Sequence, residues 1–431
     1  MIRIRTLFAV LACLIASGAA RAEGALVIAG GALKADNAAV VEAFIDRAGG
    51  PEDARIAIIS AASGYPSGSA DGAAAMFARY GVEAERITPV KLAVMDDPDT
   101  DGVDESDWAA NADAPEEIAH VHAATGVWFT GGDQARLSTL LITEDGTDTP
   151  MLAALRARLD AGAVIGGTSA GAAMMSPVMV ARGDALPALL EAPLVVRPGE
   201  DYPETERLVL AAGLGFFPYG VTDQHFGERA RLGRLARAAA MQSEPRRLGG
   251  GVDENTALIV DLATDEAIVR GAGAVTILNA REARRETLDD GAVVIEGLGV
   301  SVLTNGDAID LAALSVTPAA YKAATVGEEY FDRQVADGGG MAVAAGPLQD
   351  LLGEALLDNA GAARLSRTSF SGRAGVIYAF AQTAASQGWW GRDESGAGRY
   401  AVHAVSFDIT PVRVETEPLA PASSQNESDA P

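Results

Sequence analysis

One stretch decides the fold of this chain: Val164-Ile165-Gly166-Gly167-Thr168-Ser169-Ala170-Gly171-Ala172-Ala173. It begins with apolar, strand-forming residues, narrows to small residues around one serine, and continues into helix-forming alanines. A strand, a tight turn and a helix with Gly167-x-Ser169-x-Gly171 at the turn form the nucleophile-elbow pattern. Glycine is needed there because a Cβ at either flanking position would collide with the neighbouring strand or helix. The pattern predicts a nucleophilic serine, and the alternative is a βα turn whose serine only caps the helix.

The residues before this stretch alternate between strand and helix patterns, which predicts an α/β fold with a parallel sheet flanked by helices on both faces. In such sheets the functional sites lie at the carboxyl ends of the strands. We therefore expect Gly30-Gly31, Thr130 to Gln134 and the elbow to meet at one edge. The predicted strands are 25–31, 55–60, 85–90 and 126–130, and the predicted helices are 37–48, 69–80, 134–141 and 152–159.

Beyond Ala263 the pattern changes to short strands separated by turn residues, which indicates a C-terminal β-rich, α+β extension. The last residues are acidic and rich in proline and serine, a composition typical of disorder. The predicted organisation is a signal peptide at 1–22, an α/β peptidase domain at 23–311, an appended α+β module at 312–415 and a disordered tail at 416–431.

The first residues have the features of an export signal. Arg3 and Arg5 precede the apolar run Leu7 to Ala16, which is too short to span a bilayer with margin, and Ala20-Arg21-Ala22 is an A-x-A cleavage site. Lipid attachment at Cys13 is disfavoured because the residues after it are still apolar. We expect cleavage after Ala22 and a secreted or periplasmic protein that is free of the membrane.

Cleavage would also remove the only cysteine, which excludes a cysteine nucleophile and a disulfide. The leader holds three arginines and no acids, so the mature chain has 30 basic and 59 acidic residues and a net charge of −29. Such a charge repels nucleic acid and attracts a cationic substrate. The alternative is that the acidity only keeps an exported protein soluble. No cofactor is predicted.

An acidic insertion lies between the third and fourth predicted strands, from Asp96 to Glu117. Within it, Asp97-x-Asp99-x-Asp101-Gly102 matches the first half of a calcium-binding loop. The match then fails, because Trp108 stands where the closing carboxylate belongs. A solvated acidic loop is therefore the favoured interpretation, and no metal site is predicted.

A serine nucleophile needs a base, and four histidines are the candidates. His225 follows a segment rich in glycine and proline, stands at the end of a predicted strand, and has polar residues before it. We predict His225 as the base. Three others occupy positions typical of structural histidines: His120, His122 and His403.

The acid that orients the base can come from three carboxylates after the serine: Asp223, Glu254 and Glu191. Asp223 is too close in sequence to face His225 easily. Glu254 stands at the start of another predicted strand and is freer to reach the imidazole. Glu254 is therefore preferred, with the other two as alternatives.

An oxyanion hole takes one N–H from the residue after the nucleophile, here Ala170, and one from a neighbouring strand-end loop. The Gly131-Gly132 pair supplies that loop, with Gly132 as the expected donor. A helix predicted from Glu228 to Met241 carries several arginines. They either bind substrate carboxylates in a bidentate manner or pair with acids on the surface.

Four segments taken together resemble the cyanophycinase family of serine peptidases, which is related to dipeptidase E. They occur in order over about residues 25–305, and each alone is a modest signal. The segments are Phe129-Thr-Gly-Gly-Asp-Gln134, Gly166-Gly-Thr-Ser-Ala-Gly171, Asp223-Gln-His-Phe226 followed by Arg229-x-Arg231-Leu-Gly-Arg234-Leu235, and Asp253-Glu-Asn-Thr-Ala257.

The resemblance implies a fold like that of class I glutamine amidotransferases, with Ser169 as nucleophile, His225 as base and Glu254 as third member. It implies hydrolysis of cyanophycin, a poly-aspartate with arginine on each side chain, to β-Asp-Arg dipeptides, and a homodimer. Two alternatives are a related peptidase for short Asp-containing peptides and a non-catalytic polymer-binding protein on the same fold. The residues that the resemblance places around the substrate are Asp133, Gln134, Asp223, Gln224, Arg229, Arg231 and Arg234.

Overall fold

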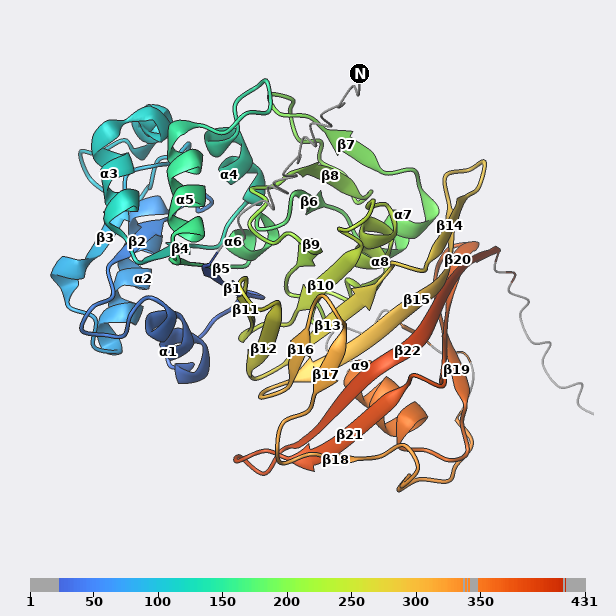
Figure 1. Ribbon diagram of the computed structural model, residues 1–431. Helices are drawn as coiled ribbons and strands as arrows, with labels where there is room; N and C mark the ends of the chain where they lie inside the picture. Colours follow the sequence, from blue (N-terminus) through green and yellow to red (C-terminus); the bar gives the residue numbers. More distant parts are fainter. Residues whose placement is uncertain (1–22, 336–337, 339, 342–347, 414, 416–431) are drawn as a thin grey trace, which may run out of the picture.

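The computed structural model describes residues 23–335, 338, 340–341, 348–413 and 415 (Figure 1). The predicted signal peptide at 1–22 and the predicted tail at 416–431 lie outside the described residues. No helix within the described ranges is long and apolar enough to cross a membrane.

Five parallel strands form one side of a nine-stranded sheet, and the predicted motifs follow the ends of three of them, β1, β4 and β5. Their side chains alternate between two apolar layers, because successive residues of a strand point to opposite faces. Leu26 and Ile28 belong to one layer, and Val27 and Ala29 belong to the other. In sheet order the five strands are β1 (Ala25–Ala29), β5 (Val164–Thr168), β4 (Gly126–Phe129), β2 (Ile56–Ile59) and β3 (Ile87–Val90).

Helices cover both faces of these strands (Figure 1). Phe44 and Phe77 both pack edge-on against Trp128 on one face. Leu137 and Leu155 belong to the apolar layer on the other face. The first face carries α1 (Ala38–Arg47) and α2 (Pro66–Arg79), and the second carries α3 (Pro115–Ala123), α4 (Gln134–Leu141) and α5 (Pro150–Asp160). Short 3-10 helices are η1 (Ala84–Arg86) and η2 (Glu105–Asp113).

The sheet is mixed, because antiparallel strands extend it beyond β1. The predicted α/β fold with parallel strands between helices is confirmed, and the antiparallel strands add to this parallel part. The added strands, in order from β1, are β11 (Thr256–Asp261), β12 (Glu266–Gly271), β16 (Ala308–Asp310) and β17 (Ser315–Thr317).

A second, ten-stranded sheet continues across the predicted domain boundary between residues 311 and 312. The long strand β15 (Val293–Thr304) pairs antiparallel with β22 (Gly398–Arg413). The register between β15 and β22 shifts between Ile295 and Leu298. The strand-rich C-terminal region is thus confirmed, and the exact domain division stays a prediction.

The other strands of this sheet are β9 (Gly220–Asp223), β10 (Leu248–Val252), β13 (Ala274–Asn279), β14 (Arg284–Thr287), β18 (Ala323–Ala324), β19 (Arg364–Ser371), β20 (Ala374–Ala381) and β21 (Gln387–Arg392). A small sheet holds β6 (Val178–Arg182), β8 (Val209–Ala212) and β7 (Leu194–Val196). The remaining helices are α6 (Ala170–Ala173), α7 (Ala185–Leu190), α8 (Leu232–Ala240), α9 (Leu348–Leu352) and the π-helix η3 (Gly353–Leu357).

Candidate active site

The elbow has the geometry that its sequence predicts. β5 ends at Thr168, α6 begins at Ala170, and Ser169 between them has φ 54° and ψ −110°, a conformation that a residue with a Cβ seldom adopts. A Cβ on Gly167 would lie 2.5 Å from the Gly171 carbonyl oxygen, and one on Gly171 would lie 2.6 Å from that of Phe129. The predicted close approach to the strand and to the helix is therefore confirmed.

The structure brings together the three residues selected for a catalytic triad. Ser169 Oγ lies 2.9 Å from His225 Nε2, and His225 Nδ1 lies 2.6 Å from Glu254 Oε1. The two other candidate acids are engaged elsewhere: Asp223 with Arg234, and Glu191 at 3.6 Å from Arg207. Glu254 is thus the carboxylate that faces the imidazole.

The backbone around His225 fixes the direction of its ring. His225 has φ 44°, in the left-handed region, and its N–H donates to the Gly30 carbonyl at 2.6 Å. Gly31 packs against the imidazole so closely that a Cβ there would lie 2.3 Å from His225 Cε1. The Gly30-Gly31 turn therefore supports the base. The sequence placed this turn at the right edge without indicating that role.

The surroundings of His225 keep the imidazole neutral near pH 7. Burial lowers the pKa of His225 below 6.5, and the charges of Arg229 and Arg231 lower the pKa further, while the Glu254 contact opposes them. A neutral imidazole can accept the hydroxyl proton of Ser169 while donating its Nδ1 proton to Glu254.

The two predicted oxyanion donors lie beside the serine. A Cβ on Gly131 would stand 3.3 Å from Ser169 Cβ, so the Gly131-Gly132 loop borders the nucleophile. Gly132 has φ +141° and leaves no room for a Cβ, which would meet the Ala62 carbonyl oxygen at 2.0 Å. Within the described part of the chain, no hydrogen bond uses the N–H of Gly132 or Ala170. Gly132 is exposed, whereas Ala170 is buried.

Asp133 and Gln134 hold neighbouring segments in place. The Asp133 carboxylate accepts from Ala135 N at 2.9 Å, which caps α4, and lies 3.2 Å from Arg182 Nη2. Gln134 is buried, and its Nε2 donates to the carbonyls of Val180 and Ala181. These contacts anchor β6 beside the strand-end loop, so neither side chain is free in this structure.

Two of the predicted substrate-binding arginines face an internal carboxylate. Arg234 Nε and Nη2 donate to Asp223 at 2.8 and 2.6 Å, and both side chains are buried. Arg231 donates to the Gln224 carbonyl and lies 3.6 Å from Asp223. A substrate carboxylate would have to compete with Asp223 for both guanidinium groups.

The helix of arginines begins later than predicted, at Leu232 instead of Glu228. Ala230 has φ 50°, in the left-handed region, so no continuous helix runs through it. Arg229 lies in the preceding turn and is exposed, with no ion pair to any other described residue. The buried side-chain oxygen of Gln224 also lacks a hydrogen-bond partner among the described residues. Of the predicted substrate set, these two groups are unengaged.

The predicted solvated acidic loop is partly wrong, because three of its acids, Asp97, Glu105 and Glu117, are buried. Asp97 accepts from Gly68 N at 2.9 Å and Asp99 N at 3.1 Å, and Glu105 accepts from Thr100 Oγ1 at 2.8 Å. These acids cross-link the loop and pin it to the start of α2. Across the described ranges, no group of three or more His, Cys, Asp or Glu side chains is arranged to hold a metal ion.

A hydrogen-bonded serine, histidine and glutamate on such an elbow place this protein among the serine-type hydrolases. Residues 100–267 match the model of Peptidase family S51. The chain is 32% identical over 277 residues to the cyanophycinase of Synechococcus elongatus, covering 63% of this chain and 74% of that protein. It belongs to the cyanophycinase family of serine peptidases, as the sequence motifs indicate.

Two further cyanophycinases show similar agreement. That of Geminocystis herdmanii (strain PCC 6308) is 35% identical over 244 residues, 56% of this chain and 75% of that protein. That of Nostoc sp. (strain PCC 7120 / SAG 25.82 / UTEX 2576) is 32% identical over 288 residues, 66% and 84% of the two chains. Among solved structures, a peptidase from an acI-B1 Actinobacterium is 20% identical, with a TM-score of 0.45 over 68% of this chain and 98% of that one.

Proposed function

We propose that this protein is a secreted serine exopeptidase that hydrolyses cyanophycin, multi-L-arginyl-poly-L-aspartate, to β-Asp-Arg dipeptides through an acyl-enzyme on Ser169. The observation that carries the proposal is the hydrogen-bonded line from Ser169 Oγ through His225 to Glu254. It occurs in a chain of the cyanophycinase family.

In the acylation step, Ser169 Oγ attacks the scissile carbonyl carbon while His225 Nε2 accepts the hydroxyl proton. Glu254 stabilises the imidazolium through Nδ1–H. When the tetrahedral intermediate collapses, the C–N bond breaks and His225 transfers the proton to the leaving amine. In deacylation the same imidazole takes a proton from water as the water oxygen attacks the acyl carbon. When the ester C–O bond breaks, His225 returns this proton to Ser169 Oγ.

The negative charge of the tetrahedral intermediate develops at the carbonyl oxygen. The N–H groups of Gly132 and Ala170 are the proposed donors, and removing one such donor typically costs about 3 kcal/mol of transition-state stabilisation. Gly132 is exposed and its loop borders Ser169, so its N–H is the more accessible of the two.

The charge of the protein suits an arginine-bearing polymer. A net charge of −29 in the proposed mature chain favours approach of a cationic substrate. A positive charge also lies near the serine, because Arg229 is exposed and its charge acts on His225. Arg229 is therefore the proposed partner of an aspartyl carboxylate, and the free side-chain oxygen of Gln224 is a proposed acceptor for substrate N–H groups.

The decisive experiment incubates the purified mature chain with cyanophycin granules and follows β-Asp-Arg by mass spectrometry. Wild-type protein should release the dipeptide, and Ser169→Ala should release none above the uncatalysed background. Ser315→Ala, which changes an exposed serine on β17, is the matched control and should retain full activity. Intact granules in the presence of folded wild-type protein would refute the proposal.

Two other outcomes identify the alternatives. Cleavage of short Asp-containing peptides without release from the polymer indicates a related peptidase. Polymer binding that survives Ser169→Ala, together with no labelling by serine-directed acylating reagents, indicates a binding protein. Export is tested separately by N-terminal sequencing of the secreted or periplasmic protein, which should begin at Glu23.

A further inference from the structure

The loops that carry the base and the acid are joined by two carboxylates that take no part in the proton transfers. The geometry assigns Asp253 and Glu228 as positioning residues that lock the His225 loop to the Glu254 loop. This inference rests on the proposed function, because it concerns the same three residues.

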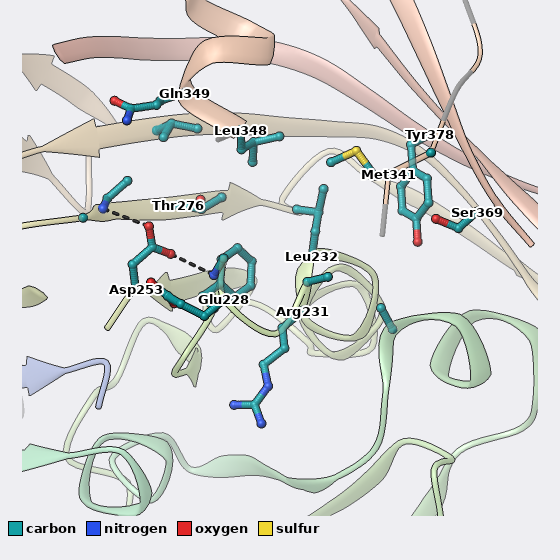
Figure 2. Close-up of a pocket in the computed structure, with 18 of the residues that line it drawn as sticks. Glu228, Arg231, Leu232, Asp253, Thr276, Met341, Leu348, Gln349, Ser369 and Tyr378 are labelled. Carbon is teal, nitrogen blue, oxygen red and sulfur yellow. Dashed lines mark hydrogen bonds between the residues drawn. The ribbon is translucent and has the colours of Figure 1, made fainter. Parts of the chain in front are cut away.

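Asp253 forms the first part of the lock. Its Oδ1 accepts the N–H of Gly227, two residues after His225, at 2.8 Å, and its Oδ2 accepts the N–H of Ala274 at 2.9 Å. Figure 2 shows both hydrogen bonds as dashed lines from the Asp253 carboxylate. Ala274 is the first residue of β13, so Asp253 connects the base loop to the second sheet. The next residue in the chain is Glu254.

Glu228 forms the second part of the lock, from the His225 loop to the Glu254 loop. It stands three residues after His225, and its Oε2 accepts the backbone N–H of Glu254 at 3.1 Å. Each loop thus supplies a carboxylate that binds the backbone of the other. The two bonds set the separation between the loops, and that separation sets the distance between His225 Nδ1 and Glu254 Oε1.

The other side of the acid loop is also fixed. Asn255 donates its N–H to the Gly31 carbonyl at 2.8 Å, and its carbonyl accepts from Asn37 Nδ2 at 2.9 Å. Because Gly31 packs against the His225 ring, Glu254 is flanked by residues that are tied to the same imidazole. Because Asn255 stays fixed, loss of an Asp253 hydrogen bond should tilt the Glu254 carboxylate relative to the imidazole.

Keeping the Asp253 carboxylate charged costs free energy, which argues that its hydrogen bonds to Gly227 and Ala274 are not incidental. No cation forms an ion pair with Asp253 among the described residues, and a cavity of about 440 Å³ adjoins Asp253 and Glu228 (Figure 2). Arg231 lines this cavity too, but its Nη1 donates to the Gln224 carbonyl. Burial first, and then the negative charges of Glu228 and Glu254, raise the pKa of Asp253 to about 6.

The test exploits the number of acceptors that each side chain offers. Asparagine has one acceptor oxygen, so Asp253→Asn places an NH2 group against a backbone N–H and breaks one of the two links. Glutamine at position 228 keeps an acceptor, whereas alanine does not. Asp253→Asn and Glu228→Ala should each lower kcat by about 10- to 100-fold with little change in KM, and Glu228→Gln should restore most of the activity.

The pH profile separates positioning from simple stabilisation. In Asp253→Asn the acid limb of kcat should move to lower pH, because the weakened Glu254 contact no longer raises the pKa of His225 and residue 253 no longer titrates near pH 6. Asp310→Asn is the control for the loss of a carboxylate charge. Asp310 is the last residue of β16, and its Oδ1 accepts the backbone N–H groups of Ala312 and Ala313. It should change neither kcat nor the acid limb.

Labelling of Ser169 by an acylating reagent counts the active sites and normalises every rate. An unlabelled and inactive wild-type protein would refute the proposed function. An active wild type together with a folded Asp253→Asn of unchanged kcat and acid limb would overturn the lock alone. If Asp253→Asn does not fold, equal kcat values in Glu228→Ala and Glu228→Gln would overturn it.

Discussion

Arg234 Nη2 lies 2.6 Å from Asp223 Oδ1, with the two side chains 5% and 1% exposed. Burial alone would raise the pKa of Asp223, but the adjacent Arg234 and Arg231 outweigh it and hold that pKa below its usual value. The pair closes the end of β9, two residues before His225. An arginine predicted to meet the substrate therefore also supports the strand that presents the base.

Removal of Arg234 should destabilise the fold. Arg234→Ala leaves a buried carboxylate uncompensated, and the loss in free energy of unfolding should be about 3–5 kcal/mol, measured by urea denaturation at pH 7. Arg47→Ala is the control, since Arg47 and Asp261 are 37% and 35% exposed and their contact should contribute at most about 1 kcal/mol. Equal losses in free energy of unfolding in the two variants would contradict a larger contribution from the buried pair.

The identity of the acid can be tested by an isosteric change. Glu254→Gln can donate to His225 Nδ1 and so favours the wrong tautomer, which should lower kcat by up to about 10⁴-fold without unfolding the protein. Glu191→Gln changes another acid that the sequence offered, and it should leave kcat unchanged because Glu191 contacts Arg207 instead. The reverse ranking in steady-state kinetics would exclude Glu254 as the orienting acid.

The pH dependence of kcat/KM follows from the state of His225. Its protonated form cannot accept the serine proton, and burial places its pKa below 6.5. Activity should therefore be full at neutral pH and should fall as pH decreases through that lowered pKa. Rates measured from about pH 4 to pH 8 would contradict this if the acid limb were centred above 6.5.

The support that Gly31 gives the base can be separated from backbone strain. Gly31 and Gly50 both have positive φ, +110° and +86°, but only a Cβ at Gly31 would meet His225, while nothing lies within 4 Å of one at Gly50. Gly31→Ala should lower kcat by about 100-fold because the imidazole is displaced. Gly50→Ala should reduce thermal stability only. Similar kcat values in the two variants would rule out this role for Gly31.

Much of the fold and of the site follows from short-range patterns. The alternation of apolar strands and helices predicts the central parallel sheet, because the periodicity of burial is local to each element. The elbow at Ser169 is equally local, since Gly167 is required by its contact with Gly171 within the same turn. The place of His225 at the end of a predicted strand indicates it as the base. These features needed no knowledge of distant residues.

The sequence by itself determined the elbow, the strand-end motifs and the family to which the chain belongs. Only the tertiary structure decided which carboxylate pairs with which cation or imidazole. It turned Asp223 toward Arg234 and Glu254 toward His225, and it joined β15 to β22 across about 100 residues. The physical reason is that desolvation and charge pairing depend on residues that only folding brings together. Backbone conformation and the periodicity of burial depend on residues that are adjacent in the sequence.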